Sequence, residues 1–230
     1  LVQHWAPIFA QKSIDIEAAN SVLEKWATPM LLDSVPPPDR STMVKVIRRA
    51  RHSAAVLDGI PYAGWQADPE ISALVLYPLL ELMLGGSCLP NGAHDSLFVF
   101  VAKVDPSVTS GFIKASETRP LALKKVDVKL LSATISVAVK PILNISTHEK
   151  QRGFIPKRNF IVNVLDADSR SRCFAAKYVM PEPFVPSDVP VCTAWDFSAA
   201  FPSLSQLWMT MALSARGAPD SLILFVRSLY

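Results

Sequence analysis

The stretch ISALVLYPLLELMLGGSCLPNGA, residues 71–93, is the most apolar part of the chain. Its length would suit a membrane-spanning helix. Pro78 and Glu81 lie inside it, however, and Gly85 with Gly86 ends the helical pattern. We therefore predict a helix from about residue 69 to residue 84 that is buried in the core of a globular protein.

The chain before this helix alternates between helical and irregular segments. Residues 14–27 have the spacing of an amphipathic helix, and residues 41–51 (STMVKVIRRAR) predict a basic helix. Between them, LLDSVPPPDR (31–40) is expected to lack regular structure, because proline restricts the residue before it and has no backbone donor. A loop with Asp58 and Gly59 then leads to the buried helix.

The chain after the buried helix predicts a mixture of strands and helices. Strand-forming residues concentrate in SLFVFVAK (96–103) and VCTAW (191–195), and helical spacing is found in residues 124–147, 158–179 and 203–215. Pro141 is expected to kink or end the first of these helices. Gly217 and Pro219 mark the end of the last one and the start of another.

Two more segments of this part of the chain have an expected structure. The helix over 158–179 is expected to make its apolar contacts through Ile161, Val164, Leu165, Phe174 and Tyr178, and the four prolines in PEPFVPSDVP (181–190) predict an irregular loop. Helices interspersed with a few separated strands indicate an α+β fold, with the helices packed on a small, mainly antiparallel sheet.

The composition excludes several protein classes. Half of the residues are hydrophobic and 19% are charged, which excludes a disordered or collagen-like chain. The cysteines (Cys88, Cys173, Cys192) and the histidines (His4, His52, His94, His148) are scattered, so neither a disulfide framework nor a structural zinc site is expected. Polar residues interrupt the N-terminus, so no secretory signal is predicted.

Positive charge gathers in the middle of the chain. Residues 101–180 hold 14 Lys or Arg and 6 Asp or Glu, a net charge of +8, between flanks of net −3 and −2. Such a segment favours a polyanionic partner, and a solvated face whose charge evens out after folding is an equal alternative.

Asp196 is the most suggestive single residue, because it follows the predicted strand VCTAW. A carboxylate at the end of a strand is well placed to bind a divalent metal together with phosphate oxygens. The alternative is a turn or helix-capping aspartate.

Six short motifs follow one another along the chain. They are DGIPYAGW (58–65), FVFVAK (98–103), RPLAL (119–123), QRGFIPKRN (151–159), AWDFSAAFPSL (194–204) and GAPDSLILFVRSLY (217–230), with the helical segment KLLSATISVAVKPIL (129–143) after the third. In this order the chain resembles the reverse transcriptases of non-LTR (LINE-type) retrotransposons, and the resemblance covers nearly the whole sequence.

The resemblance implies part of an RNA-directed DNA polymerase. The fold would be a partial right hand with an N-terminal helical extension (1–57), the fingers and the start of the palm (58–190), and a palm segment with the first catalytic aspartate (191–230). Two Mg²⁺ ions would clamp the attacking and leaving oxygens during template-directed addition of dNTPs. The implied partners are an RNA template and a DNA primer, with no membrane, inside the nucleus and cytoplasm.

The resemblance also implies roles for single residues around the nucleotide. Asp196 matches the first metal-binding carboxylate, and the backbone after it, at Phe197, would help to hold the triphosphate. Phe201 matches the aromatic residue that excludes ribonucleotides. Arg119 matches the arginine that grips the triphosphate, and Lys103 is a second candidate for that contact. Core packing of Phe201 and a plain surface position for Lys103 are the alternatives.

A second set of matching residues would lie beside the template. Gln151, Gly153 and Phe154 match a loop near the template and the nucleotide, with Gln151 on the nucleotide side. Arg152, Lys157 and Arg158 add positive charge next to it, which suits contact with nucleic acid.

Three departures from the family pattern favour a second hypothesis, given at the end of this paragraph. Lys157 stands where the family usually has glycine, Pro202 stands where it has aspartate, and no Tyr-x-Asp-Asp hairpin occurs. The chain begins at Leu1 and stops at Tyr230 inside an apolar segment, which suggests a fragment that is inactive alone. The alternatives are a non-catalytic nucleic-acid-binding remnant of a decayed or domesticated element, and an unrelated α+β domain. No GxSxG, GxxxxGK[ST] or GxGxxG motif supports a hydrolase or a nucleotide-binding fold.

Overall fold

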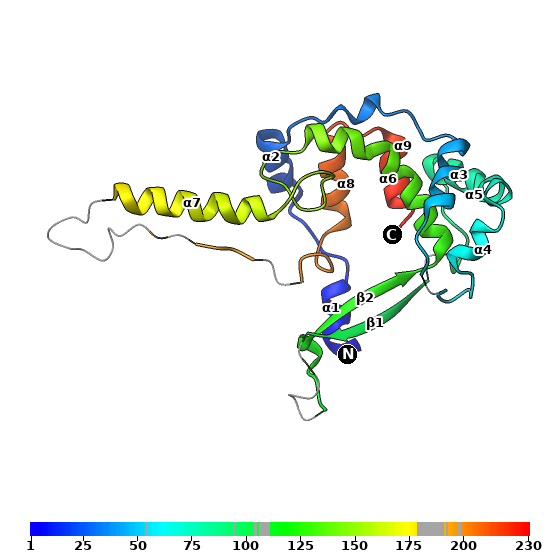
Figure 1. The fold of residues 1–230 in the computed structure, drawn as a ribbon, viewed down its shortest axis with the longest axis horizontal. Helices are drawn as coiled ribbons and strands as arrows, with labels where there is room; N and C mark the ends of the chain where they lie inside the picture. The colour runs from blue at the N-terminus through cyan, green and yellow to red at the C-terminus, as the bar shows by residue number, and fades with distance from the viewer. Residues whose placement is uncertain are drawn as a thin grey trace.

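A computed structural model describes residues 1–53, 55–93, 95–103, 105, 111–178, 191, 193–196 and 199–230. Its helices are α1 (Val2–Phe9), α2 (Ile16–Trp26), α3 (Arg40–Arg49), α4 (Tyr62–Gln66), α5 (Pro69–Leu84), α6 (Val126–Ser146), α7 (Ile161–Lys177), α8 (Gln206–Ala215) and α9 (Asp220–Arg227), as Figure 1 shows. The strands β1 (Ser96–Ala102) and β2 (Thr118–Lys124) form one antiparallel hairpin. The short 3₁₀ helices η1 (Leu31–Ser34) and η3 (Ala115–Glu117) complete the elements. The fold is mixed, helical with a small sheet, as the α+β prediction requires.

Helix α5 is the central element of the hydrophobic core, as the sequence predicts. The side chain of Asp68 caps its N-terminus by accepting hydrogen bonds from the backbone of Glu70 and Ile71, both at 3.1 Å, and Pro69 occupies its first turn. The helix ends at Gly85, and Gly86 adopts a φ of 84°, which suits glycine. Pro78 lies inside the helix without ending it.

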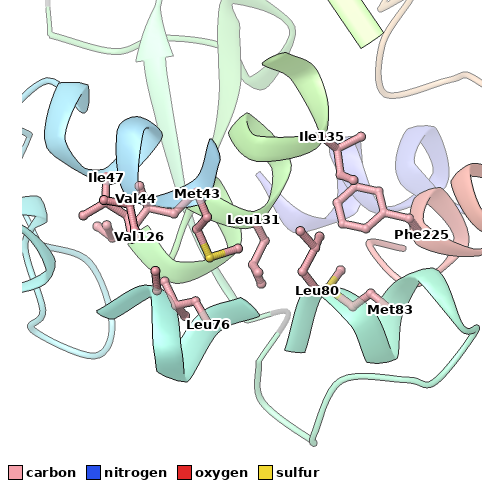
Figure 2. Packing of buried hydrophobic residues seen from close by; sticks show 12 residues of the cluster. Met43, Val44, Ile47, Leu76, Leu80, Met83, Val126, Leu131, Ile135 and Phe225 are labelled. Carbon is pink, nitrogen blue, oxygen red and sulfur yellow. The ribbon is translucent and has the colours of Figure 1, made fainter. Parts of the chain in front are cut away.

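The core brings together helices from the whole length of the chain. In Figure 2, side chains of α3, α5, α6 and α9 converge on one cluster that includes Met43, Ile47, Leu80, Leu131 and Phe225. These helices therefore pack mainly on one another. The sequence-based prediction that the helices pack on the sheet is wrong for them. The cluster contains residues from all three expected segments (1–57, 58–190 and 191–230), and these segment boundaries stay a prediction.

Helix α6 begins and ends close to the predicted limits, but Pro141 does not end it. The helix continues for five residues beyond this proline, to Ser146. In the described part of the chain, α6 is the one helix long and apolar enough to cross a membrane. Its first half nevertheless contributes Val126, Leu130 and Leu131 to the core, so its apolar character has a structural explanation.

Helix α1 covers one face of the β hairpin. Trp5 and Phe9 contact Phe100 and Phe98, with ring centroids 6.4 and 5.3 Å apart. The indole Nε1 of Trp5 donates a buried hydrogen bond of 3.2 Å to Oγ1 of Thr118. Strand β1 agrees with the prediction over 96–103, and β2 contains the RPLAL motif, for which no strand was predicted. Helices α1 and α4 were not anticipated either.

Two local predictions are wrong, and a third is not tested. The linker over 31–40 contains the 3₁₀ helix η1, whose Leu32 is buried against Ala218 and Ile223. Residues 191 and 193–195 are not in a strand, because no neighbouring strand pairs with them among the described residues. The predicted loop over 181–190 lies outside the described residues.

Helix α7 differs from its prediction in its packing. It begins at Ile161 rather than 158, and none of its residues is buried. Ile161, Val164, Leu165 and Phe174 are all exposed, since α7 projects away from the helical body in Figure 1. Phe174 contacts the ring of Tyr178, which directly follows the helix, with ring centroids 5.6 Å apart. In the described part of the chain, Phe174 and Tyr178 therefore contact each other, and none of the five predicted side chains joins a hydrophobic core cluster.

Candidate nucleotide and nucleic-acid interface

The β hairpin carries two of the residues predicted to contact the triphosphate. Arg119 pairs with Val101 in the antiparallel register, and Lys103 lies two residues beyond Val101, directly after the end of β1 at Ala102. The backbone N–H of Lys103 donates to the carbonyl of Glu117 at 2.7 Å, so the ladder continues through this residue. Because side chains alternate along a strand, Lys103 and Arg119 share one face of the hairpin.

This face is the one that α1 leaves open. Thr118, next to Arg119, points toward Trp5 on the covered face, so Arg119 points the other way. Both cationic side chains are exposed. Nζ of Lys103 donates to the carbonyl of Ser116 at 2.8 Å, and no ion pair found in the described residues involves Arg119.

Aliphatic side chains fill the rest of the open face, a feature that the sequence analysis did not single out. They are Leu97, Val99, Val101, Leu121 and Leu123, and all are exposed. The signal was present in FVFV, where apolar residues do not alternate with polar ones, a pattern typical of a strand that is covered on both sides. The two cations therefore stand at one end of an apolar surface.

Arg158 is engaged by the main chain around the end of α6. Its Nη2 donates to the carbonyls of Asn144 and Thr147 at 2.7 and 3.0 Å, and its Nη1 donates to those of His148 and Gln151 at 2.7 and 3.0 Å. The last carbonyls of a helix have no partner within the helix, so this guanidinium satisfies them. The positive charge of Arg158 therefore holds the loop together.

Arg152 joins the same loop to α7. Its Nη1 donates to Oδ2 of Asp166 at 2.9 Å and to Oδ1 of Asn163 at 2.7 Å, and its side chain is only 17% exposed. Lys150 also donates to Asp166, at 3.1 Å. The hydrogen bonds from Arg152 and Lys150 hold the pKa of the Asp166 carboxyl below its ordinary value.

The tip of this loop faces solvent. Phe154 is 96% exposed and Lys157 is exposed, and both adopt a positive φ, of 63° and 65°. Nε2 of Gln151 donates to the carbonyl of Gly153 at 3.1 Å, which closes the tip on itself. The positive φ at Lys157 is the conformation for which glycine is favoured. The loop thus keeps that conformation with lysine in place, at the cost of backbone strain.

Two of the residues expected around the catalytic metal, Asp196 and Phe201, lie outside helices and strands. Asp196 is exposed, Phe201 is 86% exposed in a turn, and Phe197 lies outside the described residues. The packed core position considered for Phe201 is therefore wrong. Ser203 closes this turn, with its Oγ donating to the carbonyl of Ala199 at 2.9 Å.

The described residues do not fit a two-metal centre. No group of three His, Cys, Asp or Glu side chains that could hold a metal ion occurs among them. A single carboxylate such as Asp196 does not supply the oxygen ligands that two Mg²⁺ ions require.

No protein-family model matches the chain, and the search of curated proteins found no match. The likeness to reverse transcriptases therefore rests on the order of its short motifs. The structure brings Lys103 and Arg119 together on the hairpin, and Gln151, Gly153, Phe154 and Lys157 together at the loop tip.

Proposed function

We propose that this chain is the nucleotide- and template-facing part of an RNA-directed DNA polymerase of the non-LTR retrotransposon type. The observation that carries the proposal is the shared position of Lys103 and Arg119 on the open face of the hairpin. The motif order assigns both residues to the triphosphate, although they lie 16 positions apart in the sequence. Antiparallel pairing brings both residues to the same end of the hairpin, where we propose that they bind one phosphate chain.

Each of the two cations suits a different part of this task. The guanidinium of Arg119 offers parallel N–H groups that match two phosphate oxygens at once. The ammonium of Lys103 acts as a compact point charge, held near the hairpin end by Ser116. The exposed aliphatic side chains beside them exclude water from one side, which strengthens the electrostatic attraction to a bound phosphate.

The loop tip supplies the proposed template contact. Phe154 presents a ring on which an unpaired base stacks, and Lys157 presents a charge for the adjacent phosphate. Arg152 and Arg158 support this contact indirectly, because their hydrogen bonds fix the loop on α6 and α7. RNA template, DNA primer and dNTP remain the proposed partners, in the nucleus and cytoplasm.

The second candidate function is nucleic-acid binding without polymerisation. The observation that favours it is the lack of a metal-binding group among the described residues. Both candidates predict that the hairpin and the loop bind their ligands, and they differ only in primer extension. We propose that the chain by itself binds and does not extend.

Binding of a dNTP is the direct test. Displacement of a fluorescent nucleotide by dNTP should weaken in Arg119→Lys, which keeps the charge and loses the paired N–H groups, and weaken further in Arg119→Gln. Lys25→Gln, on α2 outside the basic segment, is the charge-matched control and should bind as the parent does. Equal dNTP binding by the parent and the three variants would contradict the proposed triphosphate site. Primer extension by the chain alone would contradict the proposal that it binds without extending.

A further inference from the structure

We propose that the groove between α3 and the start of α6 is a second binding site, which takes the phosphate backbone of single-stranded nucleic acid. The inference goes beyond the proposed function, because it rests on charge and geometry and not on the family motifs. The groove has a volume of about 600 Å³. Cationic side chains from two helices line it, and they belong neither to the hairpin nor to the loop tip.

The basic residues of α3 divide between two faces of the helix. Met43, Val44 and Ile47 point into the core. Arg48 lies on another side, where its Nη2 binds Oε1 of Glu70 at 3.0 Å. Lys45 and Arg49, four residues apart, therefore share the remaining face, and both line the groove.

The cations at and just after the end of α3, Arg49 and Arg51, are not needed to cap the helix. Basic residues at a helix C-terminus often serve there, by binding the last carbonyls. Here the side chain of Gln66 does so, with Nε2 donating to the carbonyls of Ile47 and Ala50 at 3.0 and 2.8 Å. The side chains of Arg49 and Arg51 are exposed and line the groove instead.

The opposite wall comes from α6, with an aromatic floor from α4. Lys129 reaches the groove from the first turn of α6 and is half-buried. Leu130 and Val137 add apolar surface, and Tyr62 contributes a half-buried ring. Burial raises the pKa of the Tyr62 phenol, so the hydroxyl stays a neutral hydrogen-bond donor.

The charge of the groove is not balanced from within. Four of the described residues that line it are cationic: Lys45, Arg49, Arg51 and Lys129. None of the described lining residues is Asp or Glu. Like charges around one cavity repel one another, and this cost is offset when an anion binds among them. Multiple cations spread over two helices suit a chain of phosphates better than a single anion.

The nearby ring of Tyr62 makes single-stranded nucleic acid the favoured occupant. Binding sites for single strands combine a cationic track for the backbone with aromatic surfaces for the bases. An acidic peptide would use the cations and leave the ring without a role. RNA and DNA share the phosphodiester chemistry, so both are expected to bind.

Neutralising variants test the groove by fluorescence anisotropy with a labelled single-stranded RNA of about 16 nucleotides. Lys45→Gln combined with Arg49→Gln is expected to weaken binding about tenfold and to lower the salt slope by about 0.7 for each lost phosphate contact. Arg48→Gln is the matched control on the same helix and should keep the RNA affinity and the salt slope of the parent. Equal losses in the control and the double variant, or no loss in either, would overturn the proposal.

Further arms identify the occupant and separate this site from the proposed triphosphate site. Adding Lys129→Gln to the double variant should weaken RNA binding further. If this triple variant does not fold, the comparison between the double variant and Arg48→Gln still tests the groove. Single-stranded DNA should bind as RNA does, and rejection of DNA would contradict backbone recognition. Displacement of RNA by poly-glutamate at equal charge would contradict nucleic acid as the occupant. Binding of dNTP should be unchanged in every groove variant, so its loss in Arg119→Gln reports on the proposed function alone.

Discussion

Arg158 and Asn144 are joined across the turn that follows α6, with Nη2 of Arg158 donating to the backbone carbonyl of Asn144 at 2.7 Å. Three more carbonyls, of Thr147, His148 and Gln151, accept from the same guanidinium. A residue that the motif QRGFIPKRN suggests as a nucleic-acid contact therefore also organises the loop that would make the contact. The two roles can be separated by experiment.

Replacing Arg158 by lysine should loosen the loop while keeping its charge. Lysine has no planar fork, so most of the four hydrogen bonds are lost, and the loop should be destabilised by about 2 kcal/mol. Hydrogen exchange of the amides around residues 144–158 measures this. Arg170→Lys, on the exposed part of α7, is the control and should leave exchange unchanged. Unchanged exchange together with weaker RNA binding would instead make Arg158 a direct contact.

Replacing Thr118 by valine should weaken the attachment of the hairpin to α1. Valine keeps the shape of the side chain but leaves the buried Nε1 of Trp5 without its acceptor, at a cost of about 1–3 kcal/mol. Urea denaturation followed by circular dichroism measures the loss. Thr147→Val, at the half-buried residue directly after α6, is the matched control and should change stability by less than about 0.5 kcal/mol. Equal stability of Thr118→Val and the parent would show that this hydrogen bond contributes nothing net.

Replacing Leu80 by alanine should be among the most damaging single changes. Its side chain is fully buried among α3, α6 and α9, so truncation leaves a cavity and costs about 2–5 kcal/mol. Leu82, on the same helix, is 53% exposed, and Leu82→Ala should cost well under half as much. Denaturant midpoints of the two variants give the comparison. Similar midpoints would contradict the position of α5 at the centre of the core.

Asp39 provides a prediction in pH. It caps α3 by accepting hydrogen bonds from the side chain and backbone of Thr42 and from Ser41, and these lower the pKa of its carboxyl from 3.8 to about 2. Since the pKa is lower in the folded chain, the cap stabilises fully above pH 3.8 and is lost as the pH falls to about 2. An NMR titration of the carboxyl measures the midpoint. Thr42→Val should raise that midpoint, and an unchanged value would assign the low pKa to another cause.

Replacing Lys157 by glycine should relieve backbone strain at the loop tip. Its φ of 65° costs a residue with a Cβ about 1 kcal/mol relative to glycine. The variant should therefore raise the thermal midpoint slightly and weaken RNA binding, because the charge is also removed. Lys157→Ala separates the two effects, since it removes the charge and keeps the strain. A lower midpoint for the glycine variant would contradict the strain.

Much of the local structure follows from short-range signals. Asp68, Pro69 and Gly85 mark the ends of α5 within the sequence itself, and Gly217 with Pro219 marks the boundary between α8 and α9. These residues act on the backbone within one turn, so no distant partner is needed. The prediction failed where a distant partner was decisive, as for VCTAW, which has strand-forming residues but no described strand beside it.

The sequence by itself determined the positions of α3, α5, α6 and β1, the charge of the middle segment and the motif order. Only the tertiary structure decided that α1 closes one face of the hairpin and leaves Lys103 with Arg119 on the other. It also decided that Arg152 and Arg158 bind the chain itself, and that Lys45 and Arg49 meet Lys129 across a groove. Capping and propensity are properties of neighbouring residues, whereas the face that a side chain presents to a partner depends on how separate elements pack.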